Sequence, residues 1–184
     1  AIEINDEMKL LDNLDKTADF KVYAKAAIAH VSSGTTGNYK KHLHNIKQIV
    51  GYASNRVNDL GLIQEDHLLV VLSVNHAYAF SCQFLPAITM GLKVTIIKEF
   101  DVKKVESIIS NKNVTALALL PTMYNFLAKQ KVANHNLRYL GVAGDTVSES
   151  LYNSVKQAFG LPLLNGIGMT EIIGYGQNTS SDKY

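Results

Sequence analysis

Residues 67–98 read HLLVVLSVNHAYAFSCQFLPAITMGLKVTIIK, a stretch that contains two short apolar runs with a longer apolar segment between them. Residues 67–73 and 93–98 are short runs dense in Leu, Val and Ile, which is typical of strands that are buried on both faces. Between them, residues 77–90 are apolar almost throughout, which predicts a mostly buried helix. A strand, a helix and a second strand in this order predict a unit with parallel strands.

The same alternation extends over most of the chain. The predicted strands are residues 26–33, 67–73, 93–98, 115–120, 137–143 and 161–165. Helical spacing of apolar residues predicts helices over residues 46–60, 77–90, 102–109, 124–131 and 148–159. Pro121 suits a first helical position, and Ser148 and Gly160 suit the start and the end of the last helix. We therefore predict an α/β fold with a doubly wound, mainly parallel sheet.

The composition excludes several classes of protein. The chain has 184 residues, of which 47% are hydrophobic and 18% are charged, and this argues against intrinsic disorder. A net charge of +2 is too small to indicate a nucleic-acid partner, and one cysteine forms no internal disulfide. No apolar run is long enough for a membrane span, and the acidic N-terminus is unlike a secretory signal. We therefore expect a cytoplasmic protein.

Three parts are expected along the chain: an acidic arm in residues 1–20, the α/β domain in residues 21–177 and a polar tail in residues 178–184. Acidic residues outnumber basic ones in the arm, whereas basic residues outnumber acidic ones in residues 21–60. The basic stretch is either a solvated surface or a surface that faces an anionic ligand, and its motifs decide between the two.

A loop rich in glycine and hydroxyl groups follows the first predicted strand. It reads Ser32-Ser33-Gly34-Thr35-Thr36-Gly37-Asn38-Tyr39-Lys40-Lys41. Glycines let backbone amides turn towards an anion, hydroxyls donate hydrogen bonds and lysines supply positive charge, which is what binding a polyphosphate requires. The spacing is not that of a Walker loop. The loop indicates a phosphate site, and the alternative is a polar surface turn.

A second glycine segment, Asn165-Gly166-Ile167-Gly168-Met169-Thr170-Glu171, follows the last predicted strand. The third glycine of a dinucleotide motif is missing, and Glu171 stands in its place. A carboxylate repels a pyrophosphate unless a cation lies between them, so the segment fits a magnesium–nucleotide complex better than NAD. Ligands of an open parallel sheet bind at the carboxyl ends of its strands, where both segments are expected.

Together, the two segments resemble the motifs of the adenylate-forming (AMP-binding) enzymes, a family that contains acyl- and aryl-CoA synthetases, luciferases and peptide-synthetase adenylation domains. Residues 72–78, 120–124 and 141–145 are similar to further family segments, so the likeness spans residues 24–176. The resemblance implies ATP and Mg²⁺ as cofactors. It also implies a reaction in which a carboxylate attacks the α-phosphorus and expels pyrophosphate, so that screening of negative charge dominates catalysis.

The resemblance further implies roles for individual residues. The groups expected to hold the β- and γ-phosphates are Ser33, Gly34, Thr35, Thr36, Gly37 and Lys40. The residues expected to line the adenine are Gly144, Asp145, Gly166, Ile167 and Gly168. Thr170 is expected to touch the α-phosphate and Glu171 to bind Mg²⁺, so Thr170, Glu171 and Lys40 are the expected catalytic residues.

The chain also departs from the family pattern. The family has Pro-Lys-Gly where this chain has Tyr39-Lys40-Lys41, and an aromatic residue where it has Ile167, which would contact adenine without stacking. The family's ribose-binding Asp, its catalytic Lys and its N-terminal subdomain have no counterpart in residues 1–184. We therefore expect a central fragment whose partners include flanking subdomains and which is inactive alone. The departures favour a competing interpretation, a non-catalytic nucleotide-binding or structural remnant.

The region of His76 and Tyr78 indicates the substrate class. The amino-acid-activating branch has an Asp here to pair with the substrate ammonium, whereas residues 75–78 contain no carboxylate. The His-x-Tyr pattern is similar to the acyl- and aryl-CoA ligase branch, in which this His lies beside the bound acid. We therefore expect a fatty or aromatic carboxylic acid that is transferred to a thiol of coenzyme A or of a carrier protein. In the alternative, His76 only caps the helix that begins near Ala77.

Other reactive side chains have plainer interpretations. His42 and His44 are two residues apart, but no acidic or Cys partner is spaced with them, so a metal site is not favoured. Cys82 lies in an apolar segment, which predicts packed core rather than a nucleophile. Lys103 and Lys104 are expected on a solvated helix face.

Overall fold

The structure is a computed structural model that describes residues 28–33, 39–130, 132, 134–172 and 175–178. Its central sheet has the strand order β4-β3-β5-β6-β7-β8. The strands are β3 (His67–Val70), β4 (Lys93–Ile96), β5 (Ala116–Leu119), β6 (Tyr139–Val142), β7 (Leu164–Gly168) and β8 (Tyr175–Gln177). All neighbouring pairs are parallel except β7 and β8, which are antiparallel. The predicted mainly parallel sheet is confirmed.

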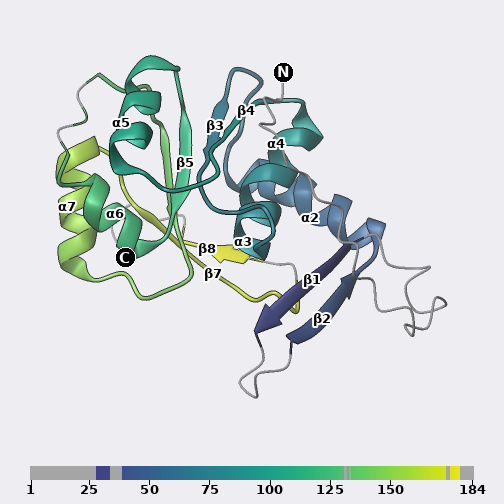
Figure 1. The fold of residues 1–184 in the computed structure, drawn as a ribbon. Helices are drawn as coiled ribbons and strands as arrows, with labels where there is room; N and C mark the ends of the chain where they lie inside the picture. The colour runs from purple at the N-terminus through teal and green to yellow at the C-terminus, as the bar shows by residue number, and fades with distance from the viewer. Residues whose placement is uncertain (1–27, 34–38, 131, 133, 173–174, 179–184) are drawn as a thin grey trace.

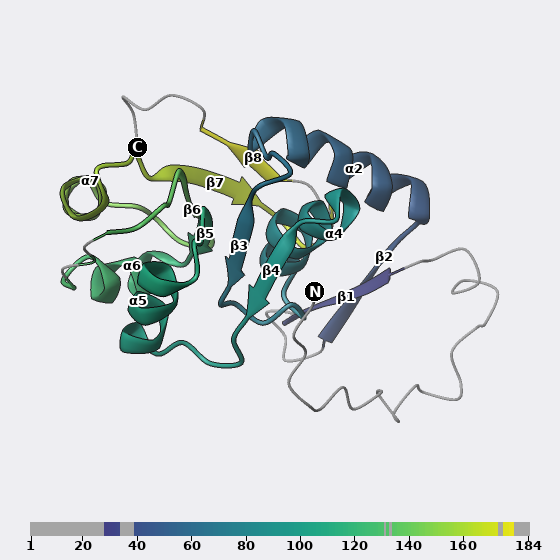
Figure 2. The same ribbon diagram turned by 90° about the horizontal axis from the view of Figure 1, so that it is seen from above.

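Helices cover both faces of this sheet (Figure 1, Figure 2). One face carries α5 (Val102–Asn111), α6 (Pro121–Leu127) and α7 (Glu149–Phe159). The other side carries α2 (Ile46–Asp59), α3 (Ala77–Ala79), the π-helical turn η1 (Phe80–Phe84) and α4 (Leu85–Met90). Successive residues of β3 enter two separate cores, Leu69 on the first face and Leu68 and Val70 on the second. The sheet is therefore doubly wound, as predicted. Among the described helices, none has the length and hydrophobicity needed to cross a bilayer.

Local signals set the helix ends where the sequence predicts them. The Ser148 side chain accepts a hydrogen bond from the Leu151 amide at the start of α7, and Gly160 ends that helix with φ 65°. Pro121 occupies the first turn of α6, where its missing N–H costs no helical hydrogen bond. These predicted caps are confirmed.

The predicted helix over residues 77–90 is helical throughout but irregular in the middle. Pro86 has no N–H and crowds the carbonyl four residues earlier, so the regular hydrogen-bond ladder cannot continue through it. In η1 the ladder widens by one residue, and the Leu85 amide donates to the Phe80 carbonyl. Cys82 lies within this turn and is 4% exposed, which confirms its prediction as core. Burial raises the pKa of its thiol to about 11, so the thiol stays protonated.

The first predicted strand does not join the parallel sheet, which corrects the sequence analysis. Strand β1 (Ile28–Ser33) pairs antiparallel with β2 (Tyr39–His44) in a separate hairpin, with Ile28 opposite His44 and Ser33 opposite Tyr39. Residues 39–41 were predicted as part of the loop and residues 42–44 were assigned to no element, but residues 39–44 form a strand. The reason is visible along β1, where His30 is buried but Val31 is 52% exposed. A strand exposed on one face suits a hairpin rather than the centre of a covered sheet.

The end of the chain also differs from the prediction. Strand β7 begins three residues later than predicted, so Gly166 and Gly168 lie within the strand rather than after it. Strand β8 was not predicted, because three residues with a central glycine carry no strand pattern. The acidic arm of residues 1–20 lies outside the described residues, and of the polar tail only Asn178 is described.

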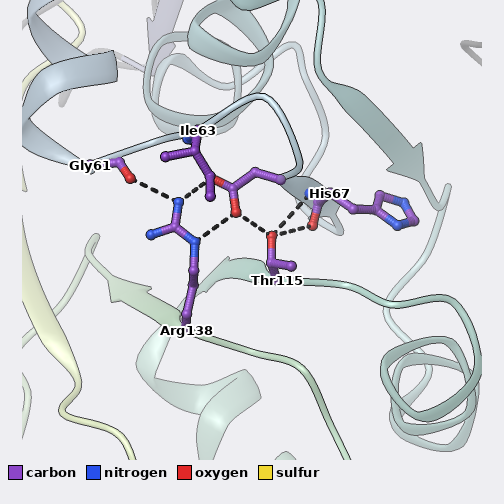
Figure 3. A network of polar contacts seen from close by, with 6 residues as sticks. Gly61, Ile63, His67, Thr115 and Arg138 are labelled. Carbon is purple, nitrogen blue, oxygen red and sulfur yellow. Dashed lines mark hydrogen bonds and ion pairs between the residues drawn. The ribbon is translucent and has the colours of Figure 1, made fainter.

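A buried polar network ties together the amino ends of β3, β5 and β6 (Figure 3). The carboxylate of Asp66, 1% exposed, accepts hydrogen bonds from two nitrogens of Arg138, from the Thr115 hydroxyl at 2.7 Å and from the Ile63 amide at 2.7 Å. Arg138 also donates to the Gly61 carbonyl at 2.8 Å. Burial raises the pKa of Asp66, but these hydrogen bonds outweigh burial and hold it below its ordinary value. The network leaves the carboxyl ends of the strands free for a site.

Candidate functional site

The β1–β2 hairpin lies beside the segment that follows β7 (Figure 1). Nε2 of His44 is 3.1 Å from the carbonyl oxygen of Thr170, a contact between residues 126 positions apart. Nε2 of His42 is 3.8 Å from a carboxylate oxygen of Glu171. Strand β2, which follows the first glycine-containing motif, is therefore adjacent to the end of the second.

Lys40 lies on the face of β2 that carries these histidines. Side chains alternate along a strand, so Lys40, His42 and His44 share one side. Lys40 is exposed and lies at the turn end of this face, whereas His44 and His42 contact Thr170 and Glu171. That Lys40, Thr170 and Glu171 act together remains a prediction.

The rest of the predicted phosphate loop is not tested by the structure. Ser33 ends β1 opposite Tyr39, and nothing is described of its side chain. Gly34, Thr35, Thr36 and Gly37 lie outside the described residues. Their phosphate contacts remain predictions.

The inner face of the hairpin is buried and rich in imidazole. The ring of His30 lies 5.5 Å from that of His44 and 5.4 Å from that of Phe80, edge to face. Burial, followed by repulsion from His44 and His42, lowers the pKa of His30, which is therefore uncharged at neutral pH. The Ser32 hydroxyl is 2.7 Å from Nε2 of His42. Hydrogen bonds and ring contacts thus hold the side chains of this face in place.

The residues expected to line the adenine follow neighbouring strands. Val142 of β6 pairs with Asn165 of β7, so the turn at Gly144 and the segment from Gly166 to Gly168 meet at one edge. Gly144 has φ +93°, and a Cβ there would lie 2.9 Å from Cδ2 of Leu120, so this turn requires glycine.

The side chains at this edge are accessible. Ile167 is 80% exposed, which leaves an apolar surface available to a ligand. Asp145 is exposed, and its carboxylate accepts a hydrogen bond from the Thr146 amide at 2.7 Å. Their contacts with adenine remain predictions.

His76 and Tyr78 follow β3, at the point where the strand order reverses between β3 and β5. His76 is exposed and occupies the N-cap position of α3, but its side chain makes no capping hydrogen bond. The alternative that His76 only caps the helix is therefore confirmed for the position of the residue, but no capping hydrogen bond of its side chain supports it. Tyr78 packs against the core of the second face, and burial raises the pKa of its phenol well above the ordinary value.

The model of a family described as AMP-binding enzyme matches residues 13–183. The chain belongs to this family. A 2-succinylbenzoate–CoA ligase from Staphylococcus aureus strain MSSA476 is 30% identical over 141 residues, which are 76% of this chain and 28% of that ligase. A second such ligase, from strain JH9, is 28% identical over the same lengths. The chain therefore spans less than a third of the length of these relatives.

Solved structures agree with the family. The N-terminal domain of FACL13 from Mycobacterium tuberculosis has a TM-score of 0.72 and 25% identity, over 79% of this chain and 37% of that one. ATP-bound MatB from Rhodopseudomonas palustris has a TM-score of 0.77 and 19% identity, over 86% and 32%. MenE from Bacillus subtilis, in complex with ATP and magnesium, has a TM-score of 0.72 and 24% identity, over 79% and 30%. The likeness to MatB and MenE shows the fold alone.

The donor set fits the magnesium ion that the family implies. In the part of the chain that the structure describes, no three His, Cys, Asp or Glu side chains gather to hold a metal ion by themselves. Mg²⁺ in nucleotide sites needs only one or two carboxylates, because substrate phosphates and waters supply the other ligands. The side chain of Glu171 is 45% exposed and offers such a carboxylate. Glu171 therefore fits the role.

The sequence analysis missed a buried cation in this family member. Arg56 of α2 is 2% exposed, donates to the Gln177 side chain at 3.0 Å and lies 3.6 Å from the Asp59 carboxylate. The Tyr139 hydroxyl donates to the same Gln177 oxygen at 2.6 Å, so this group ties α2 to β6 and β8. The signal was present, because position 56 continues the buried helical spacing of Ile49 and Ala53.

Proposed function

We propose that the chain supplies the ATP site of a ligase that activates a carboxylic acid as an acyl-adenylate and then transfers it to a thiol. The supporting observation is the His44–Thr170 contact, which holds the strand of Lys40 beside the segment of Thr170 and Glu171. An ammonium, a hydroxyl and a magnesium-binding carboxylate together suit a reaction that is catalysed by positioning and by charge stabilisation.

The proposed reaction proceeds in two steps. A carboxylate oxygen of the acid attacks the α-phosphorus of ATP, the bond from that phosphorus to the bridging oxygen breaks, and its electron pair leaves with pyrophosphate. The thiol of coenzyme A or of a carrier protein then loses its proton and attacks the acyl carbon, and AMP leaves. When bound, Mg²⁺ neutralises charge on the phosphate oxygens.

The residues of this chain divide the work of binding. We assign the β- and γ-phosphates to the loop and its lysine, namely Ser33, Gly34, Thr35, Thr36, Gly37 and Lys40. We assign adenine to the exposed edge formed by Gly144, Asp145, Gly166, Ile167 and Gly168. The Thr170 hydroxyl donates a hydrogen bond to the α-phosphate, and Glu171 holds the magnesium ion.

We propose a fatty or aromatic acid as the substrate. His76 is exposed at the switch point, and Ala77, Ala79 and Cys82 behind it are buried, so no buried carboxylate faces this region from α3 or η1. Burying a substrate ammonium without a counter-charge would cost several kcal/mol (on the order of 3–5). The names of the relatives, which are ligases of 2-succinylbenzoate and CoA, support an aromatic acid and coenzyme A.

A second candidate is a remnant that binds nucleotide, or only keeps the fold, without catalysis. Two observations favour it: Ile167 offers no aromatic ring for stacking, and the imidazole of His42 lies 3.8 Å from the carboxylate expected to hold the metal. In this candidate, Glu171 pairs with His42 rather than with a magnesium ion.

Calorimetric titration of the chain with Mg·ATP tests the roles assigned to Lys40 and Glu171, and a folded chain that binds no Mg·ATP would favour a remnant that only keeps the fold. The ligase proposal predicts binding that weakens about ten-fold or more in Lys40→Ala and in Glu171→Gln, because each loses a charged contact. Lys103→Ala is the matched control, since Lys103 is exposed on α5 away from the site, and it should bind as the wild type does. Binding that is equal in all variants would favour adventitious contact with the surface and contradict the assigned roles.

A further inference from the structure

His44 makes a directional contact with the segment that carries Glu171. Its side chain is 3% exposed, and its Nε2 is 3.1 Å from the Thr170 carbonyl oxygen. A carbonyl oxygen only accepts, so the Nε2–H of His44 is the donor. This carbonyl belongs to the peptide that joins Thr170 to Glu171, and holding it fixes the peptide plane from which Glu171 projects.

The contact repeats one step along the strand. His42 is two residues away on the same face, and its Nε2 lies 3.8 Å from Glu171 and 2.7 Å from the Ser32 hydroxyl. Strand β2 therefore runs alongside Thr170 and Glu171, one histidine beside each residue, and Lys40 comes next on this face. The order of side chains on β2 sets how far Lys40 lies from Glu171.

In the described part of the chain, no backbone pairing between strands fixes the distance between Lys40 and Glu171. The hairpin is a separate two-stranded sheet, and no ladder joins the described strands β1 and β2 to the central sheet. The His44 ring is supported from behind by His30, which packs against Phe80 of η1. Side-chain contacts therefore hold the hairpin in place.

We infer that His44 is a positioning residue: its hydrogen bond docks the hairpin on the Thr170–Glu171 segment and so presets the distance between Lys40 and Glu171. His42 lies beside Glu171 on the same face of β2. The structural part of the inference stands on the contacts alone, and only its consequence for Mg·ATP rests on the proposed function.

Amide hydrogen exchange of the full 184-residue chain tests the docking without nucleotide. His44→Leu keeps an apolar side chain of similar bulk but removes the donor, whereas His44→Gln places an N–H at a similar reach. His44→Leu should speed exchange about ten-fold in residues 39–44 and 170–172 and leave β3 and β5 unchanged. His44→Gln should restore most of the protection. His135→Leu, on the loop before β6, is the control and should change neither segment.

Three results of this experiment would overturn the inference. One is unchanged exchange in both segments of His44→Leu. Another is a rise that extends equally to β3 and β5, which would show loss of general packing rather than of docking. The third is failure of His44→Gln to protect either segment, which would show that an N–H donor at this position does not by itself dock the hairpin.

Titration with Mg·ATP then tests the consequence for the site. His44→Leu should bind about ten-fold more weakly than the wild type, and His44→Gln about as tightly. Equal affinity of His44→Leu and the wild type would refute the positioning role. A wild-type chain that binds no Mg·ATP would contradict the proposed function, and the exchange comparison would still decide whether His44 docks the hairpin.

Discussion

Asp66 carries a formal charge with only 1% of its surface exposed, and four donors from Arg138, Thr115 and Ile63 compensate for its burial. Such a group stabilises the fold only while all its partners remain. Its role was not visible in the sequence, because the acid, the hydroxyl and the guanidinium lie far apart in the chain. For Arg56 the helical spacing indicates burial, but its partner Gln177 was not visible in the sequence.

We expect Asp66→Asn to lower the free energy of unfolding by about 2–4 kcal/mol, because an amide nitrogen would face donors that need an acceptor. Urea unfolding measures this loss, and Glu65→Gln, next to it and exposed, is the control that should change little. The pKa of Asp66 is lowered in the fold, so its contribution is present at neutral pH and is lost as pH falls below about 4. A loss in Asp66→Asn that is as large at pH 3 as at pH 7 would contradict this explanation.

His30 also loses stabilisation as the pH falls, but over a higher pH range than Asp66. Its pKa is lowered in the fold by burial and then by His44 and His42, so the unfolded chain binds the proton more readily. Stability is therefore complete above about pH 6.5 and falls below it, by at most about 1.4 kcal/mol per pH unit for this group. We expect His30→Leu to lose less stability than the wild type between pH 7.5 and 5.5 in urea unfolding. An equal loss in both would show that the buried His67, whose pKa burial also lowers, dominates.

At the scale of elements, prediction from sequence succeeded where strands are buried on both faces. Strand β5, from Ala116 to Leu119, is fully buried and reads as a continuous apolar run. It failed at the hairpin, because β2 carries Lys40, Lys41, His42 and His44 and so has no apolar pattern at all. The glycine-rich motifs were recognised from their residues. The contact between the histidines of β2 and the second motif could not be predicted, because it depends on where the hairpin lies in the fold.

The turn after β6 gives a prediction at this scale. Gly144→Ala should destabilise the chain by about 1–2 kcal/mol, because φ is +93° and the new Cβ would lie 2.9 Å from Leu120. Gly51→Ala is the opposite control: Gly51 lies in the exposed interior of α2 with open space around it, so alanine should stabilise by about 0.5–1 kcal/mol. Thermal unfolding distinguishes the two, and stabilisation by Gly144→Ala would contradict the described turn.

At the scale of the whole molecule, the chain matches 28% of the length of a ligase that it resembles over 76% of its own. The segments that we propose for adenine and for the acid lie at the carboxyl ends of β3, β6 and β7, while the ribose-binding residue and the catalytic lysine that the resemblance implies have no counterpart in residues 1–184. The edge is also open, since Ile167, Met169 and Ile172 are all more than half exposed. We therefore expect the 184-residue chain to bind Mg·ATP without catalysing the reaction.

The 184-residue chain should catalyse no pyrophosphate exchange with any plain carboxylic acid, whereas a longer protein that contains it should do so. Radiolabelled pyrophosphate incorporated into ATP measures this. Within the longer protein, fatty or aromatic acids should support exchange better than free amino acids. Exchange by the 184-residue chain, or a preference for amino acids, would refute the corresponding part of the proposal.

We propose that the hairpin and the Thr170–Glu171 segment form one Mg·ATP site. Amide hydrogen exchange with and without Mg·ATP tests this proposal, with ATP and EDTA as the comparison. Mg·ATP should slow exchange in residues 39–44 and 165–171 together, and Glu171→Gln should abolish the protection of both. Protection of only one segment, or of neither at saturating Mg·ATP, would contradict it.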